Sequence, residues 1–322
     1  MFRMLLVPLD RSPLAEQAVA PAAEIARACG AAIDLVIAQA PSSLSGLRGS
    51  ASNDARWNAD HRYIESKARE LAAEASVPVT HAAMRGDPEA VICERANTIG
   101  ADLIVMTSHG RGGLSRAWLG SVTDAVVRQA AIPVLVLHAG DGTPGPVANY
   151  AYKNILVPFD ESPLAADILP AAAALARAMG ASLTLLEIVA HVPMLIPADP
   201  TLPYTVMPMI PDEVATEQLV NSTMIALTAT ARRCHEQYGV ATQAAVVASE
   251  HAAEAIIAFA RRQRMDAIAM STRGRGATRW LLGSVADKVL RSSSLPVLLR
   301  RPNSVRPQRE NVDAPARAAL SS

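Results

Sequence analysis

Aromatic side chains are scarce in this chain of 322 residues. Phe, Trp and Tyr together make up 3% of it, although half of the residues are hydrophobic. Aromatic rings are the platforms on which nucleic-acid bases stack. Net charge is lacking as well, because 30 basic residues balance 30 acidic ones, so no overall positive field attracts a polyanion. Both absences argue against a protein that binds nucleic acid.

Long hydrophobic runs and clustered metal ligands are also missing. No stretch of about 18 apolar residues is free of charge, so we expect no membrane-spanning helix. The three cysteines, Cys29, Cys93 and Cys234, lie far apart, which fits a reducing compartment, and the expected location is the cytoplasm. The seven histidines form no cluster with metal-ligand spacing, so we expect no metal site built by the protein alone.

The chain contains an internal repeat. Residues 5–15 read LLVPLDRSPLA, and residues 155–165 read ILVPFDESPLA. Further along, GSVTD at 120–124 matches GSVAD at 283–287. Agreement of this length predicts one structural unit written twice.

The repeat divides the chain into domains. We predict a first domain over residues 1–138, a turn-rich linker over 139–150 and a second domain over 151–301. An insertion rich in Pro and Met at 193–211 lengthens the second domain, and its prolines exclude regular helix or strand. Residues 302–322 have no periodic apolar pattern, so we predict a disordered tail.

Apolar runs and helical patterns alternate along each copy. In the first copy, Ser12 and Pro13 offer an N-cap and a first helical residue, and Gly30 ends the helix that follows. The strands expected in this copy are residues 4–9, 33–38, 77–84, 101–107 and 134–137. Apolar strands with crossover helices are typical of a parallel sheet covered on both faces. The predicted fold is α/β, with two tandem doubly wound (Rossmann-like) domains, each with a five-stranded, mainly parallel sheet.

Two junctions in each copy carry candidate ligand chemistry. In a doubly wound sheet, ligands bind at the carboxyl ends of strands where the winding direction reverses. The first junction ends a strand in an acid, Asp10 in one copy and Asp160 in the other. The second is a glycine-rich loop after the fourth strand that leads to Gly120 and Ser121 at a helix start. Free N–H groups and a hydroxyl at a helix start suit an anion such as phosphate.

The residues alone leave other interpretations open. The loops do not match the P-loop pattern, since no Lys precedes a Ser or Thr at the required place, nor do they match the dinucleotide pattern. A glycine turn after a strand is often purely structural, and the repeated Asp can serve only as a helix cap. No general base, P-loop lysine or catalytic triad is in place, so a dedicated enzyme is not expected.

The repeated segments resemble the universal stress protein family in its tandem form. The resemblance is carried by the two repeated starts, by RGDP at 85–88 with ADLIVM at 101–106, and by the closing GSV and PVLV segments. In the ATP-binding branch of that family, the signature is G-x2-G-x9-G-[ST]. The first copy reads T-x2-G-x9-G-S from Thr107, and the second reads S-x2-G-x8-G-S from Ser271. A hydroxyl residue thus replaces the first glycine in both copies, and the second loop is one residue shorter.

This resemblance implies an adenine-nucleotide site in each half. The strand-end Asp residues would face the ribose or adenine, Ala38 and Ile188 would lie against the base, and the glycines with the following hydroxyl would meet the phosphates. The implied binding residues are Pro8, Leu9, Asp10, Ala38, Thr107, Gly110, Arg111, Gly120, Ser121 and Val122 in the first half, and Pro158, Phe159, Asp160, Ile188, Ser271, Gly274, Arg275, Gly283, Ser284 and Val285 in the second. The implied cofactor is ATP or another adenine nucleotide, with Mg²⁺ or Mn²⁺ arriving on its phosphates.

The function implied by the resemblance is that of a cytoplasmic stress-response protein. It would bind ATP in one or both halves and act as a nucleotide-dependent regulator, with at most slow hydrolysis. The alternative is an interaction or scaffold protein in which one or both pockets no longer bind. An unidentified protein partner is expected, without nucleic acid or membrane. The closing strands at 133–137 and 296–300 are expected to pack the copies together as a pseudo-dimer, and a homodimer of the whole chain is a further option.

Overall fold

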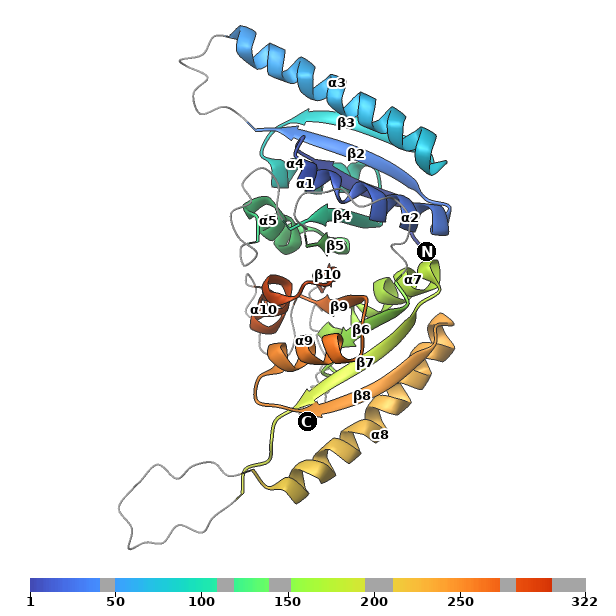
Figure 1. The fold of residues 1–322 in the computed structure, drawn as a ribbon, viewed down its shortest axis with the longest axis vertical. Coiled ribbons are helices and arrows are strands. Elements are labelled where there is room, and N and C mark those ends of the chain that lie inside the picture. The colour runs from blue at the N-terminus through green and yellow to red at the C-terminus, as the bar shows by residue number, and fades with distance from the viewer. Residues whose placement is uncertain (41–49, 109–118, 139–151, 195–210, 273–281, 303–322) are drawn as a thin grey trace, which may run out of the picture.

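A computed structural model describes residues 1–40, 50–108, 119–138, 152–194, 211–272 and 282–302. Its two halves have the same order of strands and helices (Figure 1). The first half consists of β1 (Met4–Leu9), α1 (Pro13–Glu16), α2 (Val19–Cys29), β2 (Ala32–Gln39), α3 (Ser50–Ala75), β3 (Val79–Arg85), α4 (Pro88–Thr98), β4 (Leu103–Thr107), α5 (Ser121–Gln129) and β5 (Val134–Leu137). The second half consists of β6 (Asn154–Pro158), α6 (Pro163–Ala166), α7 (Leu169–Met179), β7 (Ser182–Val189), α8 (Glu213–Tyr238), β8 (Thr242–Ala248), α9 (Ala252–Arg262), β9 (Ala267–Ser271), α10 (Ser284–Ser292) and β10 (Val297–Arg300).

The described strands form one continuous sheet. Its order is β3-β2-β1-β4-β5-β10-β9-β6-β7-β8 (Figure 1). Every pairing within a half is parallel. The halves are joined by β5 and β10, which pair antiparallel with Leu135 opposite Leu298. The predicted α/β class and the mainly parallel sheets are confirmed, and the closing strands of the two copies make the sheet continuous.

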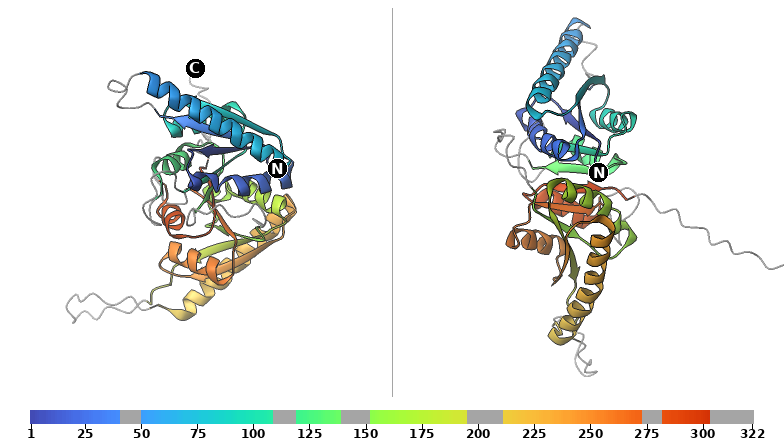
Figure 2. Two further views of the ribbon diagram at one scale, coloured as in Figure 1. Left: turned by 45° about the horizontal axis from the view of Figure 1, so that its top comes forward. Right: turned by 90° about the vertical axis from the view of Figure 1, so that its right-hand side faces the viewer.

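Helices cover both faces of the sheet (Figure 2). One face packs against α1, α2, α3, α6, α7 and α8, and the other against α4, α5, α9 and α10. Residues of β1 alternate between the two cores: Leu5 and Val7 lie in the first and Leu6 in the second, all without solvent exposure. A parallel strand flanked by helices on both faces buries both of its sides, which explains the unbroken apolar runs in the sequence.

The helix predicted after β1 is divided in two. α1 ends at Glu16, and α2 begins at Val19. Between them, the N–H groups of Gln17 and Ala18 donate to carbonyl oxygens three residues back, at 3.2 and 3.1 Å, which is the tighter 3₁₀ pattern. Gly30 closes α2 with a φ of 66°, as predicted for a glycine C-cap.

The predicted insertion at 193–211 lies almost wholly outside the described residues, as do the linker and most of the tail. The ends of the insertion meet. Pro193 and Pro211 form an isolated antiparallel bridge, and the Asp212 N–H donates to the Val192 carbonyl at 2.7 Å. The Asp212 side chain then caps α8. The insertion therefore leaves and re-enters the fold at one place, after β7.

Candidate functional site

The two predicted junctions of each half lie at the same edge of the sheet. β1 pairs in parallel with both β2 and β4, and the winding direction reverses between β1 and β4. β6 has the same relation to β7 and β9. The carboxyl ends that lead into Asp10 and Ser108 are therefore neighbours, as are those before Asp160 and Thr272. Such switch points are where doubly wound sheets bind ligands.

Asp10 orders the turn after β1. Its Oδ1 accepts hydrogen bonds from the Ser12 N–H at 2.9 Å and from the Ser12 hydroxyl at 2.6 Å. Ser12 Oγ in turn accepts from the Ala15 N–H at 3.1 Å, which caps α1. Arg11 lies between them with a φ of 68°, a left-handed conformation that non-glycine residues adopt at a cost. The Asp10 carboxylate therefore stabilises a turn that the backbone preference of Arg11 opposes.

Asp160 makes the same turn in the second half. Its Oδ1 accepts from the Ser162 N–H at 3.1 Å and from the Ser162 hydroxyl at 2.6 Å, and Ser162 Oγ accepts from the Ala165 N–H at 3.0 Å. Glu161 has a φ of 57°. Arg11 and Glu161 differ in charge and share this conformation, so the Asp and Ser residues on either side determine it. Each strand-end Asp thus has a structural role in the turn.

The backbone of Gly120 is hydrogen-bonded to the residue that follows β4. Its N–H donates to the Ser108 carbonyl at 2.7 Å, directly after β4. Gly120 is also the N-cap of α5, with φ −59° and ψ 143°, and it has no side chain to cap the helix. The first-turn N–H groups, including those of Ser121 and Val122, carry the partial positive charge of the helix start. This arrangement suits an anion.

The shorter loop of the second half reaches the same end geometry. The Gly283 N–H donates to the Thr272 carbonyl at 2.7 Å, and Gly283 caps α10 with φ −59° and ψ 142°. The Thr272 N–H donates to the carbonyl oxygen of Arg300 at 2.8 Å, and the Ser108 N–H donates to that of Leu137 at the same distance. The length difference therefore falls between these anchored ends and leaves the helix start unchanged.

The hydroxyl residues that replace the first signature glycine are buried. Thr107 is 5% exposed and Ser271 is 7% exposed. Ser271 Oγ donates to the carbonyl of Leu164 in α6 at 2.6 Å, at a helix end whose carbonyl groups lack helical partners. The Thr107 carbonyl accepts from Thr123 Oγ1 at 2.9 Å, which ties α5 to the end of β4. In the second half the replacing hydroxyl thus bonds within the protein.

Four of the predicted contact residues pack into the cores. Leu9 and Phe159, which are 4% and 7% exposed, belong to the core on the α2 and α7 face, so only their backbone atoms are left for a ligand. Ala38 and Ile188 are half-buried near the ends of β2 and β7 and pack against the opposite core. The two residues of each half therefore lie on opposite sides of the sheet.

The remaining predicted residues form three groups. Half-buried at this edge are Pro8, Pro158, Val122 and Val285. Exposed at the helix starts are Ser121 and Ser284. Outside the described residues are Gly110, Arg111, Gly274 and Arg275. The described residues of each half thus bring together the strand-end Asp and the glycine-capped helix start.

One polar cluster beside the first junction was not predicted. Asp60 of α3 is 3% exposed, and its Oδ1 lies 3.2 Å from Arg11 Nη1. Gln39, the last residue of β2, donates to Asp60 Oδ2 at 3.5 Å. The sequence signal was available, since Asp60 precedes Ile64 and Ala68 on the helix face that is buried.

The second half has a less polar arrangement at the same positions. Glu161, Val189 and Thr223 stand where the first half has Arg11, Gln39 and Asp60. Val189 is 9% exposed. The two candidate sites therefore share their turn and helix start and differ in the walls beside them.

The cysteines are not paired, and burial makes their thiols less reactive. All three are free thiols, and burial raises the pKa of Cys29, Cys93 and Cys234, which keeps them in the less nucleophilic protonated form. Within the described part of the chain, no group of three His, Cys, Asp or Glu side chains is placed to hold a metal ion. None of the helices described there is long and apolar enough to cross a membrane.

The fold and the site define a class: a duplicated, doubly wound α/β protein with a strand-end Asp and a glycine-capped helix start in each half. A model described as the Universal stress protein family matches residues 1–138 and 151–301. The chain belongs to the universal stress protein family, which confirms the resemblance found in the sequence.

Several known proteins are similar to this chain. Universal stress protein Rv2005c from Mycobacterium tuberculosis is 27% identical over 251 residues, which cover 76% of this chain and 78% of that protein. A crystal structure of a universal stress protein from Archaeoglobus fulgidus is similar in fold, with a TM-score of 0.65 at 20% identity, over 94% of this chain and 97% of that one. A universal stress protein crystallised in complex with cAMP covers 43% of this chain and 99% of its own, with 25% identity and a TM-score of 0.34.

Proposed function

We propose that this protein binds an adenine nucleotide in one or both halves, with ATP as the main candidate. It would act in the cytoplasm as a nucleotide-dependent regulator. One observation carries the proposal. In each half, a helix start capped only by glycine, Gly120 or Gly283, lies at the same sheet edge as a strand-end carboxylate, Asp10 or Asp160. The three free cysteines support a reducing compartment.

The phosphates would lie at the helix starts. The N–H groups of Ser121 and Val122, with the Ser121 hydroxyl, would bind them in the first half, and Ser284 and Val285 would do so in the second. The family signature adds Gly110 and Gly274, with Arg111 and Arg275 as a source of positive charge. Mg²⁺ or Mn²⁺ would be held chiefly by the phosphates, as is usual for these ions.

The nucleoside would lie toward the first junction. Asp10 has one carboxylate oxygen engaged by Ser12, and the carboxylate as a whole suits a ribose hydroxyl as partner. Ala38, half-buried at the end of β2, offers an apolar surface to the base. Pro8 and Leu9 would contribute backbone atoms. Thr107 and Ser271, each buried at a strand end, would line the floor of the two sites.

A regulatory role fits the position of the helices better than a catalytic one. α5 and α10 begin at the two candidate phosphate sites, and an ion pair links them: Asp124 Oδ1, in the first turn of α5, lies 3.7 Å from Arg291 Nη2, in the last turn of α10. Phosphate bound at a helix start would pull on that helix and so on the joint between the halves. Hydrolysis would be slow at most, because the sequence shows no placed general base, and a protein partner would respond to the bound state.

The test adds a negative charge at each helix start. Gly120→Asp and Gly283→Asp are compatible with the observed φ and ψ, and Asp is a good N-cap residue, so the fold should persist while phosphate is repelled. Nucleotide released on denaturation, and ATP binding by titration calorimetry, should fall from two equivalents per chain to one in either variant and to none in the double variant. cAMP serves as a competitor.

The matched controls are Gly120→Asn and Gly283→Asn, which cap the helix without charge. They should reduce binding less than the Asp variants do. One equivalent in the unchanged protein would restrict the site to the half whose variant abolishes it. No binding at millimolar ATP would overturn the proposal and favour the scaffold alternative, in which both pockets are degenerate.

A further inference from the structure

The joint between the halves rests on a short ladder. β5 and β10 pair over three residues, with Val136 opposite Val297 at one end and Val134 opposite Leu299 at the other. His138 follows β5 directly, in the first half, and its half-buried ring reaches into the second half. Contacts of this side chain therefore add to the joint itself.

Both ring nitrogens of His138 meet backbone carbonyl oxygens. Nδ1 lies 3.0 Å from the Leu295 oxygen, and Nε2 lies 2.7 Å from the Leu290 oxygen. A carbonyl oxygen only accepts, and a neutral imidazole has a single N–H. The neutral ring can satisfy one of the two carbonyls and turns a lone pair toward the other, whereas the imidazolium satisfies both. We infer that His138 is a protonation-dependent clamp that closes the joint between the two halves in its charged form.

The position of Leu290 favours that charge. Leu290 lies in the last turn of α10 (Ser284–Ser292), where carbonyl oxygens lack helical partners and carry the negative end of the helix dipole. A cation at such a helix end is stabilised.

The other half of the molecule supplies an independent observation. Arg301 follows β10 as His138 follows β5, and its Nη1 donates to the carbonyl of Arg128 at 3.2 Å. Arg128 lies in the last turn of α5, in the opposite half. The same place in the repeat is therefore filled by a permanent cation on one side of the joint and by a titratable group on the other.

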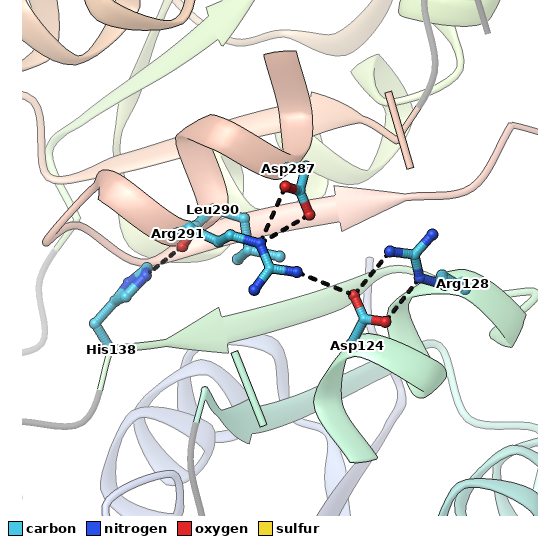
Figure 3. Close-up of polar contacts among 6 residues, drawn as sticks. All are labelled: Asp124, Arg128, His138, Asp287, Leu290 and Arg291. Carbon is cyan, nitrogen blue, oxygen red and sulfur yellow. Dashed lines mark hydrogen bonds and ion pairs between the residues drawn. The ribbon is translucent and has the colours of Figure 1, made fainter. Parts of the chain in front are cut away.

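The charged groups around the clamp are paired among themselves (Figure 3). Arg291, next to Leu290, directs its Nε to both Asp287 oxygens at 3.0 Å and its Nη2 toward Asp124 at 3.7 Å. Arg128 Nε lies 2.8 Å from Asp124.

On the strand side, Arg300 of β10 is paired with Asp167 at 2.7 Å. Arg128, Arg291 and Arg300 are thus balanced by carboxylates of α5, α10 and the α6–α7 connection. Among the described residues, the ring of His138 contacts the two carbonyl oxygens of Leu290 and Leu295.

The sign of the pH dependence follows from this geometry. The two-bond state needs the proton, so its stabilising effect is present at low pH and is lost as the pH rises and the ring becomes neutral. The halves should be held together more firmly under acid stress than in alkaline conditions.

The test compares the full-length chain with two variants over pH 5.5 to 8.5. His138→Gln carries no charge and has its donors on a single nitrogen, which cannot take the places of both ring nitrogens, and His138→Arg copies the permanent cation of the other half. The melting temperature of the unchanged protein should exceed that of His138→Gln by about 2 °C or more at pH 5.5, and the gap should close toward pH 8.5. The difference in melting temperature between His138→Arg and His138→Gln should not change with pH.

His235→Gln is the matched control. Among the described residues, the ring of His235 contacts one carbonyl oxygen, that of Val240 at 3.0 Å from Nδ1, within one half. One N–H satisfies this contact, so the melting-temperature difference caused by His235→Gln should change less with pH than that caused by His138→Gln. In the unchanged protein, nitrogen-edited NMR should show slowly exchanging N–H protons on both ring nitrogens of His138 at low pH. A pH-independent gap for His138→Gln, or a single ring N–H at pH 5.5, would overturn the inference.

Discussion

Arg95 holds the fully buried carboxylate of Asp34 with two nitrogen atoms. Nε lies 2.9 Å from Oδ2 and Nη2 lies 2.8 Å from Oδ1, while Thr80, opposite Asp34 in the next strand, donates to Oδ1 at 2.6 Å. The second half has uncharged residues at the equivalent position. There Thr184 lies opposite Gln243 and accepts from its amide at 2.9 Å.

Removing Arg95 should therefore cost far more than removing a surface ion pair. Arg95→Met leaves the Asp34 charge buried without a counter-ion, and such losses amount to about 3–5 kcal/mol. The free energy of unfolding in urea measures this change. The matched control is Arg291→Met, whose partners are partly exposed, so it should cost about 1 kcal/mol or less. Equal losses in the two variants would contradict the assignment of Asp34 as the buried charge.

The uncharged residues of the second half suggest a variant that restores the stability lost in Arg95→Met. A variant with Asp34→Thr, Thr80→Gln and Arg95→Phe copies Thr184, Gln243 and the buried Phe259 of α9. Replacement of a buried ion pair by packed residues is often neutral. We expect this triple variant to be more stable than Arg95→Met alone, as measured by the same urea unfolding.

Gly86 should tolerate a side chain less well than Gly30. Gly86 has a φ of 145°, and an added Cβ would lie 2.9 Å from Val91 Cγ2. Gly30 has a φ of 66° with open space around it. Gly30→Ala should cost about 1 kcal/mol of stability from its left-handed backbone alone, and Gly86→Ala about 2–3 kcal/mol because strain and the clash combine. Thermal unfolding measures both, and the reverse order would refute the clash.

Stability at alkaline pH should depend on the half-buried phenol of Tyr63. Burial, and then the hydrogen bond that the hydroxyl donates to Glu16 Oε1 at 2.8 Å, raise the pKa of Tyr63. A pKa raised above its unfolded value of about 10 gives stability that is present below that pH and lost as the pH rises beyond it. Tyr63→Phe should lose about 1 kcal/mol at pH 7 and show a shallower decline in stability above pH 10. Parallel declines would exclude Tyr63 as the cause.

The Ser271 hydroxyl should contribute to the stability of the fold and not to ligand affinity. Ser271→Ala removes the bond to Leu164 at 2.6 Å and leaves that carbonyl unsatisfied, at a cost of about 1–2 kcal/mol. ATP affinity of the second half, isolated in a Gly120→Asp background, should stay within twofold. A loss of affinity without a loss of stability would instead assign the hydroxyl to the ligand.

Much of the fold could be predicted because its signals are local. The apolar strand runs, the Ser12 cap and the Gly30 helix end each depend on a few neighbouring residues, and the structure shows all of them. The break at Gln17 and Ala18 was missed, since helical periodicity continues through it. The ion pair of Arg11 with Asp60 was missed as well, because it joins residues that are distant in the sequence.

The sequence by itself determined that the protein is one α/β unit written twice and that it belongs to the universal stress protein family. Repetition, periodicity and caps are properties of short segments, so they survive without coordinates. Tertiary structure decided how β5 meets β10, where the Ser271 hydroxyl donates, and which two carbonyl groups face His138. Those contacts join residues far apart along the chain, and only packing of the whole sheet brings their polar atoms within hydrogen-bond distance.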